Sequence, residues 1–267
     1  MNISFLNAFS NNIKMDCGKY YNQVGEFGLK PEDLERFRQT SRHLLDSGSL
    51  LDIGCGEGYW LKFLSETTDL QLSGSDVSQI RLNLSRKNLN NENISLSVDD
   101  ITELPYENKE FDQITALEVI EHIPEWQKGL AELVRVASKR VVITVPYNQE
   151  LIYEICPDCG GKAYVDGHIN SFTKKDFQNI IINGKVSFKG LKYPLNYYTK
   201  KALKEIIVKT KKEAEIGNEE DCTPIICPDC YKDIPSTRYA KFSKRALSRL
   251  SKIIKHYPEF LLVQIDK

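Results

Sequence analysis

Leu50–Tyr59 reads LLDIGCGEGY and decides the fold of this 267-residue chain. The stretch links an apolar strand, expected at Ser49–Ile53, to a helix that is expected to begin at Tyr59. Three alternate glycines between them permit a sharp turn and let the backbone approach a ligand without a clash from a Cβ atom. Such a turn is a weak signal by itself, because several nucleotide-binding folds use one. The segments on either side decide between those folds.

Strands and helices alternate around this turn. The sequence predicts further strands at 70–75, 94–98, 111–117, 140–145, 185–191 and 259–266. It predicts helices at 31–46, 59–67, 78–90, 126–137 and 172–182. Alternation at this spacing predicts parallel strands joined by right-handed crossovers. The roughly 67 residues between the last two strands are too many for a simple connection and imply an inserted element.

Four motifs follow the glycine turn in order. They are Ser73–Val77 (SGSDV), Asp99–Tyr106 (DDITELPY), Phe111–Ile123 (FDQITALEVIEHI) and Val142–Tyr147 (VITVPY). With the turn, they resemble the class I S-adenosylmethionine-dependent methyltransferases over roughly residues 45–150. The resemblance implies an α/β fold with a seven-stranded, mostly parallel Rossmann-like sheet, helices on both faces and an antiparallel last strand. It also implies an enzyme whose cofactor is S-adenosylmethionine.

The cofactor residues that the resemblance implies lie at the carboxyl ends of the strands, where open α/β sheets bind ligands. Asp76 would accept hydrogen bonds from the ribose hydroxyls. Asp100, with Asp99 as a rival, would accept from the adenine amino group, beside the Ile101 backbone N–H. Asp52 and Glu57 would satisfy the methionine ammonium or local backbone donors. The full expected set is Asp52, Gly54, Cys55, Gly56, Gly58, Asp76, Val77, Asp100, Ile101, Leu117 and Glu118.

Glu118, Glu121 and His122 are spaced i, i+3 and i+4, so a helical turn would bring them to one face. Two carboxylates and an imidazole can hold a divalent ion. This spacing resembles metal-dependent O-methyltransferases that act on quinones or small RNAs with a divalent ion, here Mg²⁺ or Mn²⁺. The small-RNA enzymes add a second histidine downstream, which His168 resembles. In other methyltransferases the same histidine is a base, which would make His122 and Glu118 the catalytic residues, or it is structural. The three interpretations stay open.

Two CPDC tetrads, Cys156–Cys159 and Cys227–Cys230, are the most specific signal outside the glycine turn. A two-residue spacing lets both thiolates of each pair reach one tetrahedral ion. The sequence therefore predicts a structural zinc site with four cysteine ligands, Cys156, Cys159, Cys227 and Cys230. Both tetrads are expected at the carboxyl edge of the sheet, where the zinc-bound insertion would form a lid over the acceptor.

The chain is divided, in this prediction, into an N-terminal helical cap at 1–45, a cofactor-binding core at 46–150, and a remainder at 151–267. The remainder contains the strands at about 185–191 and 259–266, with zinc-knuckle insertions at about 151–170 and 192–257. No apolar run approaches the roughly 20 residues of a membrane span, and the N-terminus lacks a basic leader. We therefore expect a cytoplasmic protein with reduced thiols.

The acceptor is less well defined than the methyl donor. The net charge is −1, but the basic residues concentrate in 185–267, which has 18 Lys/Arg and 10 Asp/Glu. This part would suit an anionic acceptor, or it is an ordinary solvated surface. The leading hypothesis is methylation of a hydroxyl or amine on a small molecule or glycan precursor. The alternatives are an RNA methyltransferase and a non-catalytic module that binds the cofactor and zinc. The oligomeric state is not predicted.

Overall fold

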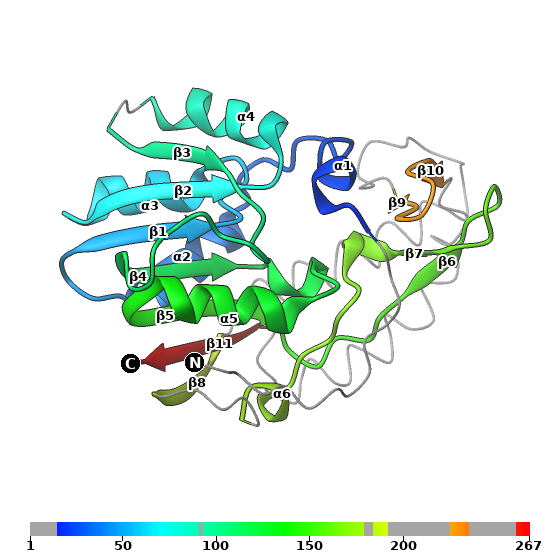
Figure 1. Ribbon diagram of the computed structural model, residues 1–267. Helices are drawn as coiled ribbons and strands as arrows, with labels where there is room; N and C mark the ends of the chain where they lie inside the picture. The colour runs from blue at the N-terminus through cyan, green and yellow to red at the C-terminus, as the bar shows by residue number, and fades with distance from the viewer. Residues whose placement is uncertain (1–14, 91–92, 179–183, 192–224, 235–259) are drawn as a thin grey trace.

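The computed structural model describes residues 15–90, 93–178, 184–191, 225–234 and 260–267 (Figure 1). A seven-stranded sheet forms its centre, in the order β3-β2-β1-β4-β5-β11-β8. β11 is antiparallel to both of its neighbours, and the other strand pairs are parallel. The bounds are β1 Ser49–Ile53, β2 Gln71–Asp76, β3 Ser95–Val98, β4 Phe111–Leu117, β5 Ala137–Pro146, β8 Lys185–Leu191 and β11 Phe260–Asp266. The expected fold class is confirmed.

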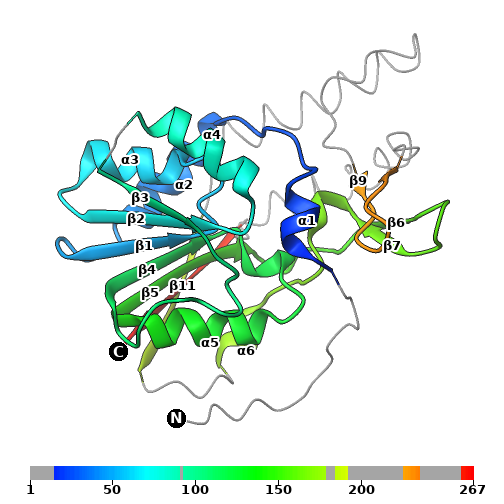
Figure 2. The same cartoon turned by 45° about the horizontal axis from the view of Figure 1, so that its top comes forward.

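Helices cover both faces of the sheet (Figure 2). One face carries α2 Pro31–Ser41, α3 Tyr59–Thr67 and α4 Gln79–Leu89, and the other carries α5 Trp126–Val136 and α6 Lys174–Gln178. A short helix, α1 Cys17–Tyr21, lies beyond the carboxyl ends of the parallel strands (Figure 1). The helices thus leave that edge of the sheet open to a ligand.

The apolar residues of β1 are buried on both faces of the sheet. Successive side chains of a strand point to opposite faces. Leu50 accordingly packs among the residues of α3 and α4, whereas Leu51 packs against α5, and both are fully buried. A continuous apolar run is what a central parallel strand requires.

The helix expected at 31–46 ends earlier, at Ser41. The Gln113 side chain of β4 explains part of this difference. Its Oε1 accepts from the Leu45 N–H at 2.8 Å, and its Nε2 donates to the Leu45 carbonyl at 3.2 Å. The backbone after the helix is thereby bonded to the sheet instead. The helix expected at 172–182 is described only as α6, because 179–183 lie outside the described residues.

Two small hairpins lie beside α1 at the open edge (Figure 1). β6 Tyr153–Ile155 pairs with β7 Lys162–Tyr164, and β9 Ile225–Ile226 pairs with β10 Asp233–Ile234, both antiparallel. Most of the insertion predicted at 192–257 lies outside the described residues, and so does most of the basic stretch. The domain boundaries stay a prediction. Among the described residues, the helices are too short or too polar to cross a membrane.

Candidate active site

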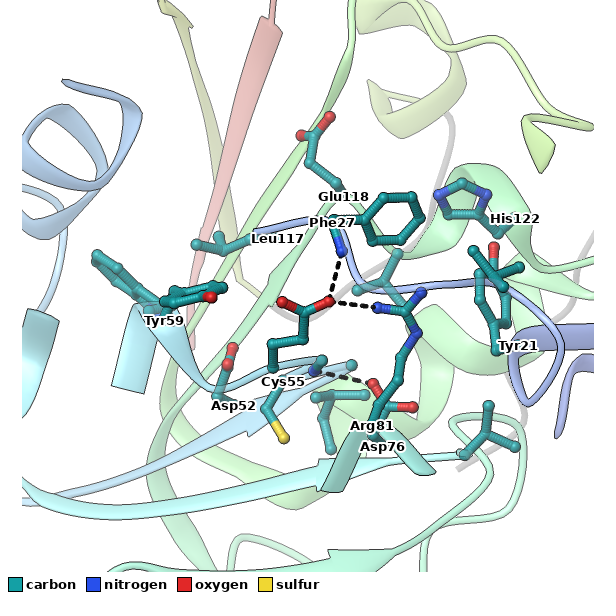
Figure 3. Close-up of a pocket in the computed structure, with 18 of the residues that line it drawn as sticks. Tyr21, Phe27, Asp52, Cys55, Tyr59, Asp76, Arg81, Leu117, Glu118 and His122 are labelled. Atoms are coloured by element: carbon teal, nitrogen blue, oxygen red, sulfur yellow. Dashed lines mark hydrogen bonds and ion pairs between the residues drawn. The ribbon is translucent and has the colours of Figure 1, made fainter. Parts of the chain in front are cut away.

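A cavity of about 440 Å³ lies at the carboxyl ends of β1, β2 and β4 (Figure 3). It brings together nearly all the residues that the sequence assigned to the cofactor. These are Asp52, Gly54, Cys55, Gly56, Asp76, Val77, Asp100, Ile101, Leu117 and Glu118, with His122 and His168 also on its wall. Gly58 is the exception, because it does not line the cavity and instead forms the N-cap of α3.

The glycine turn requires glycine for two physical reasons. Gly54, Gly56 and Gly58 all have positive φ, at 69°, 54° and 80°, which side chains with a Cβ rarely adopt. In addition, a Cβ on Gly54 would lie 2.5 Å from Val119 Cγ2. The turn therefore keeps its shape only with these small residues, and it presents backbone to the cavity.

Asp76, at the end of β2, ties its strand to the glycine turn. One carboxylate oxygen accepts from the Gly56 N–H at 2.9 Å and the other from the Ser78 N–H at 2.8 Å. Burial raises the pKa of Asp76, while these two N–H groups lower it. The side chain is 7% exposed. Asp76 is therefore held in one orientation on the cavity wall.

Asp52, at the end of β1, has a strongly raised pKa. The Trp60 indole N–H donates to Thr115 Oγ1 at 3.2 Å, and the Thr115 hydroxyl donates to Asp52 Oδ1 at 2.7 Å. Burial raises the pKa of Asp52 to about 8, although the Thr115 hydrogen bond opposes this. At neutral pH the carboxyl group is largely protonated, and a cation in the cavity would favour its ionised form.

This pKa predicts a pH-dependent stability. The ordinary carboxyl pKa is 3.8 and the folded value is about 8, so the contribution of Asp52 is full below about 3.8 and is lost as the pH rises through 8. Asp52→Asn keeps the Thr115 hydrogen bond without the charge. We expect the variant to gain stability relative to the wild type between pH 5 and pH 9, measured by urea unfolding of the ligand-free protein. A difference that stays constant over this range would contradict the raised pKa.

Asp99 and Asp100 both line the cavity but have different partners. One Asp99 oxygen accepts from the hydroxyls of Ser97 at 2.6 Å and Tyr106 at 2.7 Å. One Asp100 oxygen accepts from the backbone N–H and the hydroxyl of Thr102, both at 2.8 Å. Neighbouring residues thus orient both carboxylates. That Asp100, and not Asp99, accepts from the adenine amino group stays a prediction.

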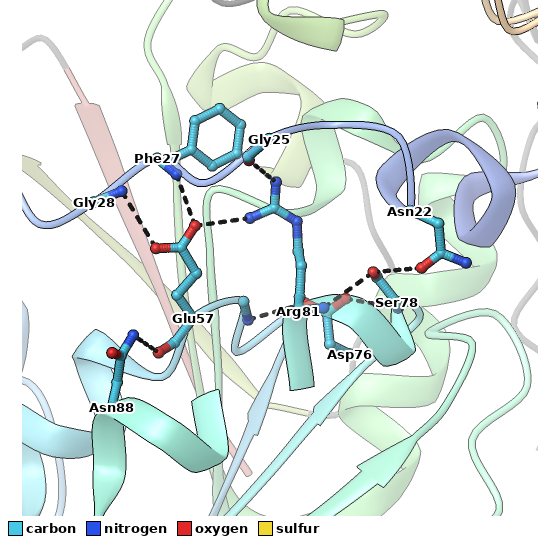
Figure 4. A network of polar contacts seen from close by, with 10 residues as sticks. Asn22, Gly25, Phe27, Gly28, Glu57, Asp76, Ser78, Arg81 and Asn88 are labelled. Atoms are coloured by element: carbon cyan, nitrogen blue, oxygen red, sulfur yellow. Dashed lines mark hydrogen bonds and ion pairs between the residues drawn. The ribbon is translucent and has the colours of Figure 1, made fainter. Parts of the chain in front are cut away.

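Glu57 binds a distant segment of the chain, a contact that the sequence did not predict (Figure 4). Its carboxylate accepts from the backbone N–H groups of Phe27 and Gly28, at 2.7 and 3.2 Å, and pairs with Arg81 at 3.6 Å. Arg81 also donates to the Gly25 carbonyl at 3.4 Å and lies 4.5 Å from the centre of the Phe27 ring. The segment before α2 is therefore fastened across the glycine turn. An acidic residue inside that turn was the available signal, but nothing in the sequence connected it to residue 27 or 81.

Glu118 departs from the expected helical turn. Its φ is +58°, and the turn that follows is a short 3-10 helix at Ile120–His122. The Glu118 side chain accepts from the Thr144 hydroxyl at 2.8 Å and lies 3.6 Å from Arg36, a residue of α2 on the cavity wall. Glu118 is consequently not one of the residues whose potential ligand atoms cluster with those of Glu121 and His122, although it lies close enough to Glu121 to raise the pKa of that group.

Glu121, which is buried, and His122 and His168, which are half-buried, form a cluster in which one potential ligand atom of each residue lies within 4.8 Å of the others. The two imidazole rings meet edge to face, 4.6 Å apart. His122 Nδ1 lies 3.0 Å from the Gly167 carbonyl and His168 Nδ1 lies 2.6 Å from Gln149 Oε1. Because both partners are oxygen acceptors, each Nδ1 carries the proton and each Nε2 keeps its lone pair.

Burial shifts the pKa values of this cluster. Glu121 is fully buried with the carboxyl group of Glu118 beside it, and among the described residues the Tyr21 hydroxyl has no hydrogen-bond partner. Burial and the neighbouring Glu118 raise the pKa of Glu121 well above its ordinary range. Burial and the neighbouring His168 lower the pKa of His122 to about 3, although the hydrogen bond to the Gly167 carbonyl opposes this shift. Both imidazoles are neutral, which is the form that binds metal ions.

The four predicted cysteines come together between the two hairpins. Their sulfur atoms lie within 4.8 Å of one another, with Cys156 and Cys230 at 3.6 Å and Cys159 and Cys227 at 3.5 Å. A disulfide would need about 2.05 Å. Four thiolates around zinc, each about 2.3 Å from the ion, lie about 3.8 Å apart. Backbone N–H groups of Cys159 and Asp158 also help to lower the pKa of Cys156 to about 7. The donor set fits a zinc ion and does not fit disulfides.

Comparisons with known proteins agree with this geometry. Residues 50–140 match the family model described as a methyltransferase domain. Methyltransferase GfsG of Streptomyces halstedii is 27% identical over 160 residues, which is 50% of this chain and 56% of that protein. Ajmaline N-methyltransferase of Rauvolfia serpentina is 29% identical over 101 residues, 36% of this chain and 35% of that protein. The chain thus spans about half or less of the length of these curated relatives.

A solved structure supports the same fold over more of the chain. The S-adenosylmethionine-dependent methyltransferase of Archaeoglobus fulgidus superposes with a TM-score of 0.53 at 15% identity, covering 89% of this chain and 95% of that one. At this identity the likeness concerns the fold. Together with the family match and the cavity, it identifies residues 50–140 as a methyltransferase domain of the class I, S-adenosylmethionine-dependent kind.

Proposed function

We propose that the protein transfers a methyl group from S-adenosylmethionine to a hydroxyl or amine of a small molecule or glycan precursor. The observation that carries the proposal is the cavity where the glycine turn, Asp76 and Asp100 converge. The curated relatives include an ajmaline N-methyltransferase, which supports a small-molecule acceptor. The RNA alternative depends on a basic stretch that is mostly outside the described residues. The cytoplasmic location stays a prediction.

In this proposal one part of the cavity binds the cofactor and another part binds the acceptor. Asp76 would hold the ribose hydroxyls, and Asp100 with the Ile101 N–H would hold the adenine. The acidic groups Asp52 and Glu118 would favour a cationic sulfonium over the neutral product. The cofactor supplies an electrophilic methyl group, so the protein mainly needs to align the acceptor with it. This division leaves the wall that carries His122 and His168 for the acceptor.

A direct test uses the purified chain and a labelled methyl donor. We expect saturable binding of S-adenosylmethionine and S-adenosylhomocysteine in calorimetry, followed by transfer of label to an acceptor in a screen of hydroxylated and amine-bearing compounds. Binding without transfer to any acceptor would favour the non-catalytic module. Absence of binding would exclude the proposed function altogether.

A second candidate, metal-dependent O-methylation, is favoured by the cluster of Glu121, His122 and His168. A buried carboxylate is costly unless it is protonated or binds a cation, and Glu121 also lies beside a second carboxyl group, that of Glu118. An imidazole whose pKa is about 3 is a weak general base at neutral pH. Two imidazole nitrogens and a carboxylate oxygen suit Mn²⁺ better than Mg²⁺, which prefers oxygen ligands. In this candidate the ion would orient the oxygens of the acceptor.

Metal dependence gives a clear prediction. Once an acceptor is known, protein that is freed of Mg²⁺ and Mn²⁺ but retains its zinc should methylate it at least about tenfold more slowly, and Mn²⁺ should restore the rate, as expected for loss of a charge-stabilising ion. Glu121→Gln should remove this response because it removes the anionic ligand. Glu125→Gln, on the exposed turn before α5, is the matched control.

An activity that is insensitive to chelation would contradict the metal and return His122 to the role of a base. In that case His122→Asn would abolish transfer to hydroxyl acceptors, and Glu121→Gln would have a small effect. The two roles exclude each other, because one Nε2 lone pair cannot bind an ion and accept a proton at once.

A further inference from the structure

The hairpin of β9 and β10, which carries Cys227 and Cys230 and is here called the second cysteine hairpin, touches α1 directly. The residues that make the contact lie next to the two cysteines in the sequence. The Asp16 backbone N–H donates to the Tyr231 hydroxyl at 3.0 Å, and Lys19 Nζ lies 4.2 Å from the centre of the Tyr231 ring. The Asp16 carboxylate in turn caps α1 by accepting from the Lys19 N–H at 2.9 Å. Tyr231, the residue after Cys230, thus holds the first turn of α1.

A small apolar cluster reinforces this contact. Ile226, the residue before Cys227, is fully buried and packs with Tyr20 and Val24, which are 4% and 9% exposed. Tyr231 itself has φ +59°, and its N–H donates to the Cys227 carbonyl at 2.8 Å. The turn that carries Cys227 and Cys230 therefore fixes both residues that reach α1.

α1 and the residues that follow it also line the cofactor cavity. Cys17, Tyr20, Tyr21 and Val24 all line it, together with the glycine turn and Asp76. α1 has only five residues, and a helix of this length is not stable by itself in water. One wall of the cavity therefore depends on what packs against α1, and the second cysteine hairpin packs there.

We propose that the metal held by the four cysteines sets the affinity for S-adenosylmethionine by keeping α1 against the cavity, with Tyr231 as the positioning residue. This inference rests on the proposed function. Zinc binding closes the turn from Cys227 to Cys230, and the turn places Ile226 and Tyr231 against α1. Loss of the ion would remove the bonds that join the two cysteine pairs and leave the turn held by weaker hydrogen bonds, such as that from the Tyr231 N–H to the Cys227 carbonyl. The cysteine site thereby acts on the cofactor although it does not touch it.

Tyr231→Phe tests the positioning role. It keeps the ring beside Lys19 and removes the hydroxyl that accepts from Asp16, so we expect S-adenosylhomocysteine to bind about threefold more weakly, as for one neutral hydrogen bond. Zinc content should not change, and with a known acceptor the KM for S-adenosylmethionine should rise while kcat is kept. Lys232→Ala is the control, because this exposed neighbour pairs with Asp158.

Removing the ion tests the coupling itself. Wild-type protein treated with a zinc chelator should bind S-adenosylhomocysteine at least about tenfold more weakly in calorimetry, and added Zn²⁺ should restore the affinity. Equal affinity with and without zinc overturns the proposal, and so does wild-type affinity in a Tyr231→Phe protein that retains its zinc. If that variant loses its zinc, the comparison of zinc-bound and zinc-free wild type decides. Failure of the zinc-bound wild type to bind the nucleoside contradicts the proposed function instead.

Discussion

Asp76→Ala is expected to weaken binding of S-adenosylmethionine roughly 100-fold. Two charge-assisted hydrogen bonds to ribose hydroxyls, each worth about 1.5 kcal/mol, together correspond to about this factor. The substitution also releases the Gly56 N–H, so the glycine turn loses a bond at 2.9 Å that fixes its shape. Titration calorimetry with S-adenosylmethionine and S-adenosylhomocysteine measures both affinities.

Two further variants separate ligand binding from folding. Asp76→Asn keeps the size of the side chain and loses its charge, so we expect an intermediate loss of about tenfold, that is, about half of the free energy. Asp112→Asn removes a carboxylate that accepts from the Ser49 N–H at the far end of β1, and it should leave nucleoside binding unchanged. An Asp76→Ala protein that is folded and binds within threefold of the wild type would contradict the role of Asp76.

Cys227→Ser is expected to abolish zinc binding and to disorder the two hairpins. A serine hydroxyl is not ionised at neutral pH and does not replace a thiolate ligand. Cys227 is also fully buried in the small core that the hairpins share with Ile225 and Ala163. The zinc content should fall from one ion per chain to almost none, measured by mass spectrometry of the metal and by a colorimetric chelator.

The matched control for this variant is Cys17→Ser, since Cys17 lies outside the cluster of four sulfur atoms. That protein should retain its zinc. Limited proteolysis should then cleave the Cys227→Ser protein within the hairpins while the sheet stays protected. A wild-type protein that contains no zinc when it is produced with zinc present would contradict the metal site itself.

The sheet was predictable because its strands carry strong local signals. β1 and β4 coincide with the expected 49–53 and 111–117, and β8 coincides with 185–191. β1 lies directly between Gly48 and the glycine turn at Gly54, so its bounds depend on nearby sequence alone. The end of α2 depends instead on Gln113, which is distant in the sequence, and for that reason the expected helix was too long.

The chemistry of the site was less predictable than its location. Parallel pairing brings the carboxyl ends of β1, β2 and β4 to one edge of the sheet, and the expected residues accordingly share one cavity. Which partner each side chain takes depends on contacts between distant segments. The Glu57 contact with residues 27 and 28, the Arg36–Glu118 pair and the Tyr231 contact with Asp16 all join residues that are at least 29 positions apart. Spacing rules describe neighbours in one helix or strand and contain no information about such pairs.

The position of β11 between β5 and β8 has a consequence for the order in which the protein is made. As the chain leaves the ribosome, β5 emerges early and carries the apolar run RVVITV at 140–145. Its hydrogen-bonding edge on that side has no partner until β11, near the end of the sequence, has been synthesised. An unpaired apolar edge is prone to pair with other chains. The nascent protein should therefore depend on chaperones during this interval, and its yield should be sensitive to the rate of translation through the long segment between β8 and β11.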